Sequence, residues 1–404
     1  MRSPSRRRFV SGIATGAAVI HASPVRSQPD ELAVGTLCPL SGPSASYGAS
    51  MQQAITAVVE RINQRGGVAG KRIRLFHENS ETDPNVAVIG ARKLIGVNRV
   101  AAILGMFASA ETLAVSPICI ESGVLLFTSA AARQISDQNH RGLIFQTEGS
   151  TVLWGPAYGD LGAKYGKTAA IATIQAPFAI DYSNDFKTTF EKAGGKIVEG
   201  PIVYAPNLNS YRGEVARIVK ARPEVVFLAG YLQDSVAIMR EAIRSGLKTR
   251  WLVLGYVLRD PQFVASLGAE FAEGAITTGP TLDKSAKGWG PYIDLVGKPE
   301  RDHHYSAQTY DQMTLLALGL EAAKGATGVA LAQAVRAVSS GPGTRVYSLD
   351  QGLEALRGGS AINYDGASSP VDFNERGMLM TVTAAAREMK NGSLEVLETY
   401  RRSL

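Results

Sequence analysis

Residues that metal and disulfide chemistry require are scarce in this chain of 404 residues. It has two cysteines, Cys38 and Cys119, and five histidines. Two cysteines this far apart do not make a metal site, and the histidines lack the spacing of metal ligands. The histidines considered are His77, His140, His303 and His304. We therefore expect no metal. Two alternatives remain for the cysteines, a disulfide or two buried free thiols.

Sequence motifs of the common enzyme classes are also missing. No G-x-G-x-x-G opens a helix after a strand, so a dinucleotide site has no support, and no G-x-S-x-G nucleophile elbow is present. Residues 162–168 resemble a phosphate loop, but the segment is one residue short and runs into a predicted strand, so we interpret it as a turn. The acidic run Glu78, Glu81 and Asp83 is typical of a solvated turn. We expect a protein that is not an enzyme and that holds no cofactor.

Neither long apolar runs nor clustered charge mark the body of the chain. The composition, 45% hydrophobic and 19% charged, is typical of a soluble globular protein, and no segment after residue 28 is long and apolar enough for a membrane helix. Most of the formal charge of +6 arises before Pro29, where five of the 42 basic residues lie and no acid is present. The remaining 37 basic residues face 36 acidic ones. This balance argues against a nucleic-acid partner, which needs clustered basic charge.

The first 28 residues are typical of an export signal. Residues Ser5 to Val10 match the twin-arginine pattern, and the apolar stretch from Phe9 to Ile20 follows. This stretch is shorter than the roughly 20 residues that span a bilayer. Cleavage after Ala22 is one alternative, and any point up to Gln28 is another. We expect residues 1–28 to be a twin-arginine signal peptide and the mature protein to be periplasmic.

Strand and helix patterns alternate along the rest of the chain. Met51, Ile55, Val58 and Ile62 have the spacing of one buried helical face. The predicted helices include residues 84–95, 154–165, 183–193 and 212–221. The predicted strands include residues 32–37, 72–76, 101–104, 124–128, 169–174, 196–203, 225–229, 251–254 and 275–278. This alternation predicts an α/β fold of parallel sheets with helices on both faces.

The length of the chain predicts two lobes, because it exceeds what one ordinary core accommodates. The alternation starts afresh after Gly149, and two helices without strands follow from His304 to Val338. We expect an N-terminal lobe of residues 29–149 plus 280–362 and a C-terminal lobe of residues 150–279 plus 363–404. About three crossings between these lobes would make a hinge.

The stretch from Val100 to Arg133 is the candidate ligand site. Ser109 has the position of a helix N-cap, where backbone N–H groups are unpaired and the helix dipole is positive. The loop from Ser129 to Ala132 has little side-chain bulk, so a ligand could reach its main-chain N–H groups. Both places follow predicted parallel strands, and open α/β sheets bind small molecules at the carboxyl ends of their strands.

Short motifs spread over nearly the whole chain carry a family resemblance. They are residues 39–43, 47–48, 62–63, 66–71, 83–84, 104–105, Ala114 with Pro117, residues 121–124 and 310–311. On these motifs, residues 31–398 resemble the solute-binding proteins of ABC importers of the branched-chain amino-acid (leucine/isoleucine/valine-binding) type. The resemblance implies a type I periplasmic binding protein: two Rossmann-like lobes that close on a ligand by hinge bending. It also implies a monomer that delivers the ligand to an ABC permease.

The same resemblance implies roles for single residues. In leucine-type members a Ser at the position of Ser109 holds the ligand carboxylate, together with small residues that match Ala130 and a Thr whose position is Ala132 here. A tyrosine of the second lobe falls at Phe178, and another falls at or beside Tyr231.

Two acidic positions of the family are not acidic in this chain. The residue that pairs the ligand ammonium aligns with Gly255, and an Asp near the first crossing aligns with Thr151. A buried ammonium without a carboxylate would be costly. Asp181, Asp234 and Glu148 are the alternatives for this role.

Aromatic residues around the predicted cleft could instead hold an aromatic or aliphatic carboxylate. Arg133 has two alternatives, pairing a carboxylate or lying in solvent. The expected ligand-binding residues are Ser109, Ser129, Ala130, Ala132, Tyr47, Trp154, Phe178, Tyr231 and Tyr256.

We therefore predict an extracytoplasmic solute-binding component of an ABC importer. Its ligand would be an amino acid of branched-chain or aromatic type or a related small carboxylate. A ligand-sensing receptor component of the same fold is the alternative. The sequence after residue 28 has neither a membrane helix nor a DNA-binding segment, which favours the importer.

Overall fold

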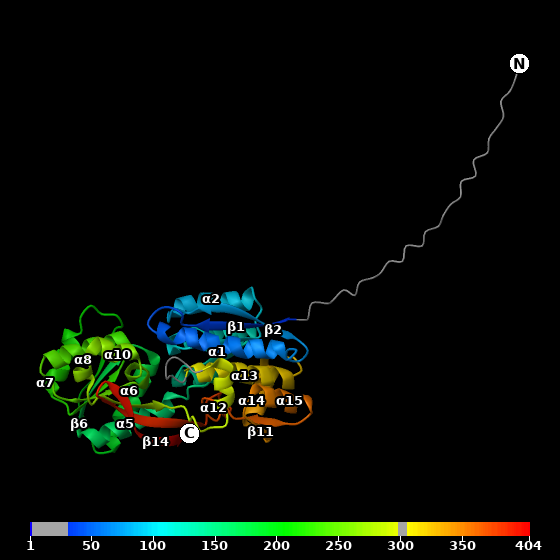
Figure 1. Cartoon of the computed structure of the whole chain (residues 1–404). Coiled ribbons are helices and arrows are strands. Elements are labelled where there is room, and N and C mark those ends of the chain that lie inside the picture. The colour runs from blue at the N-terminus through cyan, green and yellow to red at the C-terminus, as the bar shows by residue number, and fades with distance from the viewer. Residues whose placement is uncertain (2–30, 298–304) are drawn as a thin grey trace.

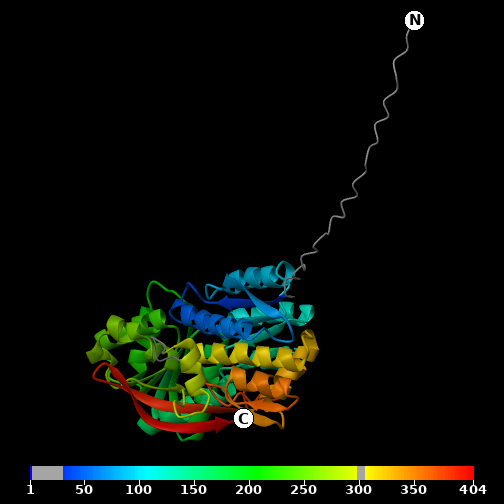
Figure 2. The same ribbon diagram turned by 45° about the vertical axis from the view of Figure 1, so that its right-hand side comes forward.

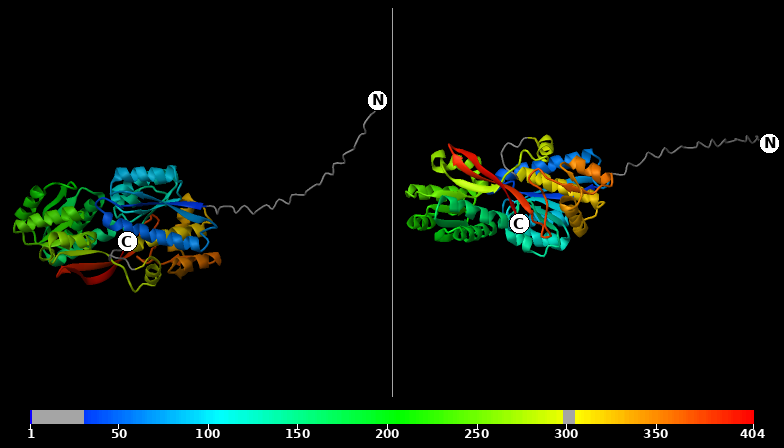
Figure 3. Two further views of the ribbon diagram at one scale, coloured as in Figure 1. Left: turned by 45° about the horizontal axis from the view of Figure 1, so that its top comes forward. Right: turned by 90° about the horizontal axis from the view of Figure 1, so that it is seen from below.

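The computed structural model of the chain describes Met1, residues 31–297 and residues 305–404. The twin-arginine motif and the apolar stretch after it lie outside the described residues, as do His303 and His304. The described chain forms two lobes, each built on its own sheet (Figure 1). The lobes stay distinct in the turned view of Figure 2 and in both views of Figure 3.

The first lobe contains a five-stranded parallel sheet in the order β2-β1-β3-β4-β5. Its strands are β1 (Glu31–Cys38), β2 (Arg72–Asn79), β3 (Ala102–Met106), β4 (Leu125–Thr128) and β5 (Ile144–Gln146). The helices packed with it are α1 (Ala45–Gln64), α2 (Pro84–Gly96), α3 (Ser109–Ser122), α4 (Arg133–Asp137), α12 (Trp289–Val296), α13 (Tyr305–Ala322), α14 (Gly328–Ser340) and α15 (Leu349–Arg357). A two-stranded parallel sheet, β11 (Thr344–Val346) with β12 (Ile362–Tyr364), lies beside α14.

The second lobe contains a seven-stranded sheet in the order β14-β13-β10-β9-β8-β6-β7. Its strands are β6 (Thr168–Ile174), β7 (Lys196–Tyr204), β8 (Val225–Ala229), β9 (Arg250–Val253), β10 (Ile276–Pro280), β13 (Thr381–Lys390) and β14 (Ser393–Ser403). The last two strands form an antiparallel hairpin, and β13 pairs antiparallel with β10. The other pairs are parallel. The helices are α5 (Thr151–Tyr165), α6 (Pro177–Lys192), α7 (Arg212–Ala221), α8 (Leu232–Arg244), α9 (Gly255–Leu258), α10 (Pro261–Leu267) and α11 (Ala269–Ala272).

Within the described residues the chain passes between the lobes three times, after β5, after β10 and after β12. Segments far apart in sequence therefore complete each lobe. In Figure 1 the yellow helix α13 lies beside the blue helix α1, and the red hairpin runs along the green lobe.

Local sequence explains these elements. The predicted face of α1, with Met51, Ile55, Val58 and Ile62, is fully buried, and this prediction is confirmed. Helix α2 begins where Pro84 takes the first helical position and the Asp83 side chain accepts the N–H groups of two following residues. Strand β8 is buried on both faces, as its unbroken apolar run predicts for a central parallel strand.

Helix α6 differs from the prediction, because it begins at Pro177 and not near Ser183. Proline is well suited to the first turn of a helix, where its missing N–H leaves no bond unmade. The earlier start places Phe178 on a helix at the end of β6.

The two cysteines are both buried free thiols in the structure. Burial raises the pKa of each thiol to about 12. Among the described residues, no helix combines the length and the hydrophobicity that crossing a bilayer demands.

Candidate ligand-binding site

The carboxyl ends of β3 and β4 in one lobe face those of β6, β8 and β9 in the other. Between them lies a cavity of about 50 Å³. Its lining comes from both lobes and from the first crossing between them. The lining residues are Phe107, Ala108, Ser109, Ser129, Ala130, Ala131, Glu148, Phe178, Tyr182, Tyr231, Tyr256 and Tyr305.

The start of helix α3 lines the cavity on the side of the first lobe. The prediction that Ser109 is the N-cap is wrong: Ala108 is the N-cap, and Ser109 is the first helical residue. The helix starts one position early because a side-chain oxygen of Glu111 accepts the Ala108 N–H at 2.9 Å. Within the described residues, the N–H groups of Ser109, Ala110 and Glu111 have no acceptor. This end can therefore hold an anion.

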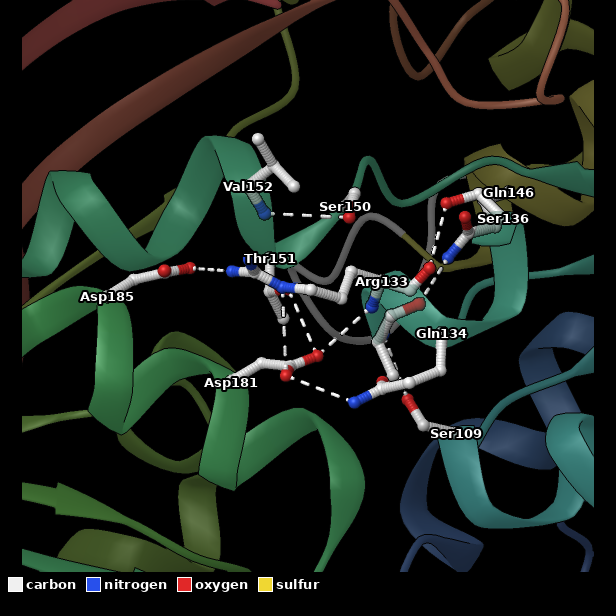
Figure 4. Close-up of polar contacts among 11 residues, drawn as sticks. Ser109, Arg133, Gln134, Ser136, Gln146, Ser150, Thr151, Val152, Asp181 and Asp185 are labelled. Atoms are coloured by element: carbon white, nitrogen blue, oxygen red, sulfur yellow. Dashed lines mark hydrogen bonds and ion pairs between the residues drawn. The ribbon is translucent and has the colours of Figure 1, made fainter. Parts of the chain in front are cut away.

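The hydroxyl of Ser109 is oriented by the neighbouring loop. It accepts the N–H of Ala132 at 3.2 Å, so its own hydrogen is left to donate elsewhere (Figure 4). Ser109 is 2% exposed and lines the cavity. A carboxylate in the cavity could accept this hydrogen.

The loop from Ser129 to Ala132 is less open than the sequence predicts. The Ser129 N–H donates to the Met106 carbonyl at 2.8 Å, and the Ala130 N–H donates to the Thr128 hydroxyl at 3.0 Å. Ala132 donates to Ser109, as described above. Only the Ala131 N–H lacks an acceptor within the described residues of this loop. The prediction that a ligand can reach the N–H groups of this loop is therefore wrong for three of the four, because the Met106 carbonyl and the hydroxyls of Thr128 and Ser109 already accept them.

One glutamine holds this loop from behind. The Gln146 side-chain amide donates to the carbonyls of Ala130 and Ala132 at 3.0 and 3.1 Å. Gln146 is 1% exposed and ends β5. The loop therefore presents a rigid surface to the cavity.

The second lobe contributes an aromatic wall from the turns after β6, β8 and β9. The ring centroid of Phe178 lies 5.6 Å from that of Tyr231 and 6.2 Å from that of Tyr256. The Tyr256 hydroxyl donates to the Gly230 carbonyl at 2.7 Å. Burial raises the pKa of Tyr231 and Tyr256 well above that of an exposed tyrosine, so both hydroxyls stay neutral.

A single acidic side chain lines the cavity among its described residues. This residue, Glu148, follows β5 at the first crossing and is 7% exposed. One of its carboxylate oxygens accepts the side-chain N–H of Gln308 at 2.6 Å. Glu148 also lines a smaller void of about 20 Å³, together with Arg259 and Tyr305.

The two lobes touch on the β1 side of the cavity. The Tyr47 hydroxyl donates to the Tyr256 carbonyl at 2.7 Å, and the Ser46 hydroxyl donates to Asp260 at 3.1 Å. The Tyr47 ring stacks on Phe107, with centroids 5.4 Å apart. Tyr47 therefore closes the cavity at its edge.

The lobes also touch on the β4 side, through a charged contact that we name the Arg133 clasp (Arg133, Asp181 and Asp185). Figure 4 shows Arg133 of α4 reaching the two carboxylates of α6. The guanidinium pairs with Asp185, and its Nε lies 3.7 Å from Asp181. The backbone N–H of Arg133 donates to Asp181 at 3.1 Å. Arg133 therefore pairs with carboxylates of the other lobe, and its pairing with a ligand carboxylate stays a prediction.

Asp185 approaches α5 at a position where only glycine fits. A Cβ on Gly155 would lie 2.3 Å from the Asp185 Cβ, closer than real contacts. A side chain at residue 155 would push Asp185 away from Arg133.

Two of the acidic residues considered for the ligand ammonium, Asp181 and Asp234, bond other groups outside the cavity. Asp181 belongs to the Arg133 clasp and also accepts from Gln134 and Thr151. Asp234 accepts the Asn207 N–H at 3.1 Å and the Tyr211 hydroxyl. Of the alternatives considered for the ammonium, only Glu148 lines the cavity.

The predicted ligand residues fall into two groups. Those that line the cavity are Ser109, Ser129, Ala130, Phe178, Tyr231 and Tyr256. Tyr47 closes the edge, and Ala132 is fully buried behind Ser109. Trp154 does not reach the cavity either, because it is fully buried in the core and its indole N–H donates to the Glu148 carbonyl at 3.1 Å.

Sequence reasoning missed several lining residues. Phe107 and Ala108 end the turn before α3, and Tyr182 lies one helical turn after Phe178 on α6. Pro177, which suits the first turn of a helix, was the sequence signal that could have extended the predicted helix over Tyr182. Tyr305 enters from α13, more than 190 residues later than Phe107, and no local signal indicates it.

A buried carboxylate lies directly behind the first lobe's wall. Glu111 is fully buried, and burial raises its pKa to about 7. Its neighbours with ionisable groups are Cys38, Asp83 and, across the cleft, Tyr231. The charge at the α3 N-terminus therefore changes near neutral pH.

A larger hollow of about 1090 Å³ lies under the β13–β14 hairpin. All of its lining residues belong to the second lobe or to the segment just after β10, such as Val264, Thr281 and Leu394. The small cavity is the better candidate site, because both lobes line it and it lies at the strand ends where α/β sheets bind ligands.

Comparison with known proteins places this geometry in context. Residues 31–357 match the family model described as periplasmic binding protein. A leucine-, isoleucine-, valine-, threonine- and alanine-binding protein of Pseudomonas aeruginosa is 26% identical over 313 residues, which cover 76% of this chain and 83% of that protein.

Two solved structures share the fold. A leucine-binding protein from Thermotoga maritima has a TM-score of 0.75 at 20% identity, with 91% of this chain and 98% of that chain covered. A solute-binding protein of an ABC transporter from R. palustris, in complex with 4-hydroxybenzoate, also has a TM-score of 0.75 at 20% identity, with 92% and 97% covered. These relatives are solute-binding proteins and not enzymes.

Proposed function

Because the chain belongs to the periplasmic binding protein family, we propose that it captures a small carboxylate by closing its two lobes and delivers it to an ABC permease. The ligand is an amino acid of branched-chain or aromatic type or a related organic acid. The family implies an extracytoplasmic location. Export by the twin-arginine route stays a prediction from residues 5–10.

The observation that carries this proposal is the cavity between the lobes. One wall offers hydrogen-bond donors at the start of α3 and at Ala131, and the other offers aromatic rings. Donors suit a carboxylate, and rings suit an apolar body. The named specificity of the Pseudomonas aeruginosa relative for small amino acids supports the same ligand class.

We propose that the ligand binds the first lobe before the lobes close. The Ser109 hydroxyl and the N–H groups around it belong to one lobe and are held by backbone geometry. The rings of Phe178 and Tyr231 then cover the ligand from the other lobe. The Tyr47 contact and the Arg133 clasp form in the closed arrangement and hold it shut.

A thermal-shift screen tests this proposal. The purified mature protein is heated with leucine, valine, phenylalanine, benzoate, 4-hydroxybenzoate or a short aliphatic acid. A ligand at 100 times its dissociation constant should stabilise the folded protein by about 2.7 kcal/mol. A shift with at least one of these acids, and none with sugars or amines that lack a carboxylate, is the expected result. Equal melting temperatures with and without every acid would contradict the proposal.

Small-angle scattering of the same samples tests closure. We expect the radius of gyration to fall when the stabilising acid is added, because hinge closure brings the lobes together. A ligand that stabilises the protein without changing the radius would contradict the hinge mechanism while leaving ligand capture intact.

A further inference from the structure

The carboxylate behind the first lobe's wall has no part in the proposed capture of the ligand. Glu111 is 0% exposed and lies in the first turn of α3. One of its oxygens accepts the Ala108 N–H at 2.9 Å, and both Ala108 and Ser109 line the cavity. Glu111 therefore lies at the same helix end as the N–H groups that would hold an anion.

The surroundings of Glu111 disfavour its charged form. Burial is the largest cause of its raised pKa, and the nearby Asp83 carboxylate also raises it. Hydrogen bonds with the Ser80 side chain and with the backbone of Ala108 and Thr82 lower the pKa, but by less than burial raises it. The pKa is about 7, so this carboxyl group gains or loses its proton near neutral pH.

The titratable groups that face Glu111 come from three other elements. Cys38 ends β1, Asp83 is the N-cap of α2, and Tyr231 is the N-cap of α8 in the other lobe. None of these three is a base that could offset a negative charge. Helices α4 and α6 also pack against α3, and their charged side chains that join the lobes bond one another in the Arg133 clasp.

The charge of Glu111 acts across the cavity. It adds to the effect of burial in raising the pKa of Tyr231, whose side chain lines the cavity from the second lobe. An anion at the α3 N-terminus would lie in this same cavity. Two negative charges repel each other strongly where water is excluded, so an ionised Glu111 opposes the binding of a carboxylate.

Resting on the proposed function, we propose that capture of the carboxylate is coupled to proton uptake by Glu111. The protonated side chain leaves the positive end of the α3 dipole to the ligand, whereas the ionised side chain competes for it. The coupling is reciprocal, so the proton favours the ligand and the bound ligand favours the proton. The protein should therefore hold its ligand more tightly in mildly acidic than in alkaline solution.

Isothermal titration calorimetry at about pH 5.5 and about pH 8.5 tests this coupling. The probes are leucine, phenylalanine and benzoate, whose carboxylates stay ionised over this range. For a probe that binds, we expect the affinity to be about tenfold lower at the higher pH, because each unit by which the ligand raises the Glu111 pKa changes the affinity about tenfold. Equal affinity at both pH values would overturn the proposal.

Proton uptake is measured directly by repeating the titration near pH 7 in phosphate and in Tris. These buffers absorb different heats when they release a proton, so uptake makes the observed binding enthalpy depend on the buffer. We expect the native protein to take up a fraction of a proton for each ligand bound. The same enthalpy in both buffers would overturn the proposal, and this measurement needs no variant.

Glu111→Gln assigns the coupling to this side chain. The variant is neutral at every pH and can still accept the Ala108 N–H. We expect it to bind the probe at both pH values as tightly as the native protein does in acid, without proton uptake. A pH dependence that survives in this variant would overturn the assignment to Glu111.

The matched control is Glu121→Gln, which makes the same change at an exposed position in the last turn of α3. It should keep both the pH dependence and the proton uptake of the native protein. The melting temperature of each ligand-free variant shows whether it is folded. Binding of a probe without pH dependence would refute this inference alone, whereas no binding of any acid in the thermal-shift screen would refute the proposed function as well.

Discussion

The two walls of the cleft contribute different interactions to ligand recognition. The first lobe's wall is made of small residues, backbone N–H groups and the Ser109 hydroxyl, all held by bonds to Glu111, Ala132 and Gln146. The second lobe's wall is made of rings that touch one another. Rigid donors define where an anion lies, and rings define which apolar body fits beside it.

The difference also appears in how the walls respond to pH. The tyrosines of the second wall remain neutral because burial raises their pKa. The first wall has Glu111 behind it, with a pKa of about 7. Only the first wall should therefore change its charge near neutral pH.

The largest expected effect comes from this buried carboxylate. Burial disfavours its charged form, so the pKa of Glu111 is about 7 in the folded protein, whereas the ordinary pKa of a glutamate is 4.5. Between these values the folded state binds more protons, so the free energy of unfolding falls as pH rises through this window. At about 1.36 kcal/mol for each pKa unit, the loss is on the order of 3 kcal/mol.

Glu111→Gln isolates this contribution, because the variant can still accept the Ala108 N–H. Urea unfolding at pH 5 and pH 8 should show a smaller loss of stability in the variant than in the native protein. Buried Asp311, with a pKa raised to about 6, has the same sign and remains in both proteins. Identical pH dependence in the two proteins would remove Glu111 as the cause.

Ser109→Ala should remove one directed donor from the first wall. We expect the affinity for a stabilising acid to fall by about 1 to 3 kcal/mol, since a buried hydrogen bond to a charged group is lost. Calorimetric titration measures this change, and the ligand-free melting temperature checks folding. Unchanged affinity would exclude Ser109 from ligand binding and leave the α3 backbone as the anion site.

Phe178→Leu tests whether the second wall recognises the apolar body of the ligand. The change keeps an apolar side chain but removes ring contacts with Tyr231 and Tyr256, which are worth about 1 kcal/mol in aromatic pairs. We expect weaker binding of an aromatic acid and little change for an aliphatic one of similar size. Competition titration of the two acids against each variant measures the ratio. An equal loss for both would show that Phe178 acts on the lobe and not on the ligand.

The smallest effect is expected at the Arg133 clasp. The Arg133 side chain is 37% exposed, so solvent screens the pair, and Arg133→Gln should weaken ligand binding by about 1 kcal/mol or less. The loss should shrink at high salt. The variant Arg345→Gln removes a surface pair with Asp365 inside the first lobe and is the matched control. If both variants bind equally well at low salt, the clasp does not stabilise closure.

Much of the fold could be predicted from the sequence because it depends on local periodicity. The buried face of α1 was predicted from its spacing, and the next helix was predicted to begin at residue 84, and the structure confirms both. The comparisons confirm the family and the α/β fold of two lobes. Local patterns suffice here because each βα unit buries its own face against its own sheet.

The site was harder to predict, since its details depend on partners remote in sequence. The Ser129–Ala132 amides looked bare because their acceptors, such as Ser109, lie on another turn. The surroundings of Glu148 depend on Gln308, 160 residues away. A single sequence shows which residues end strands, but it does not show which distant side chain has already taken each donor.

The three passages between the lobes have a consequence for how the molecule is made. The helices that cover the sheet starting with β1 are complete only when α13 has been synthesised, and the sheet that starts with β6 gains its last two strands from residues 381–403. Neither lobe can therefore complete its fold while the middle of the chain is still being synthesised. Contacts that span this much sequence slow folding. We expect both halves to acquire protection from hydrogen exchange late and nearly together.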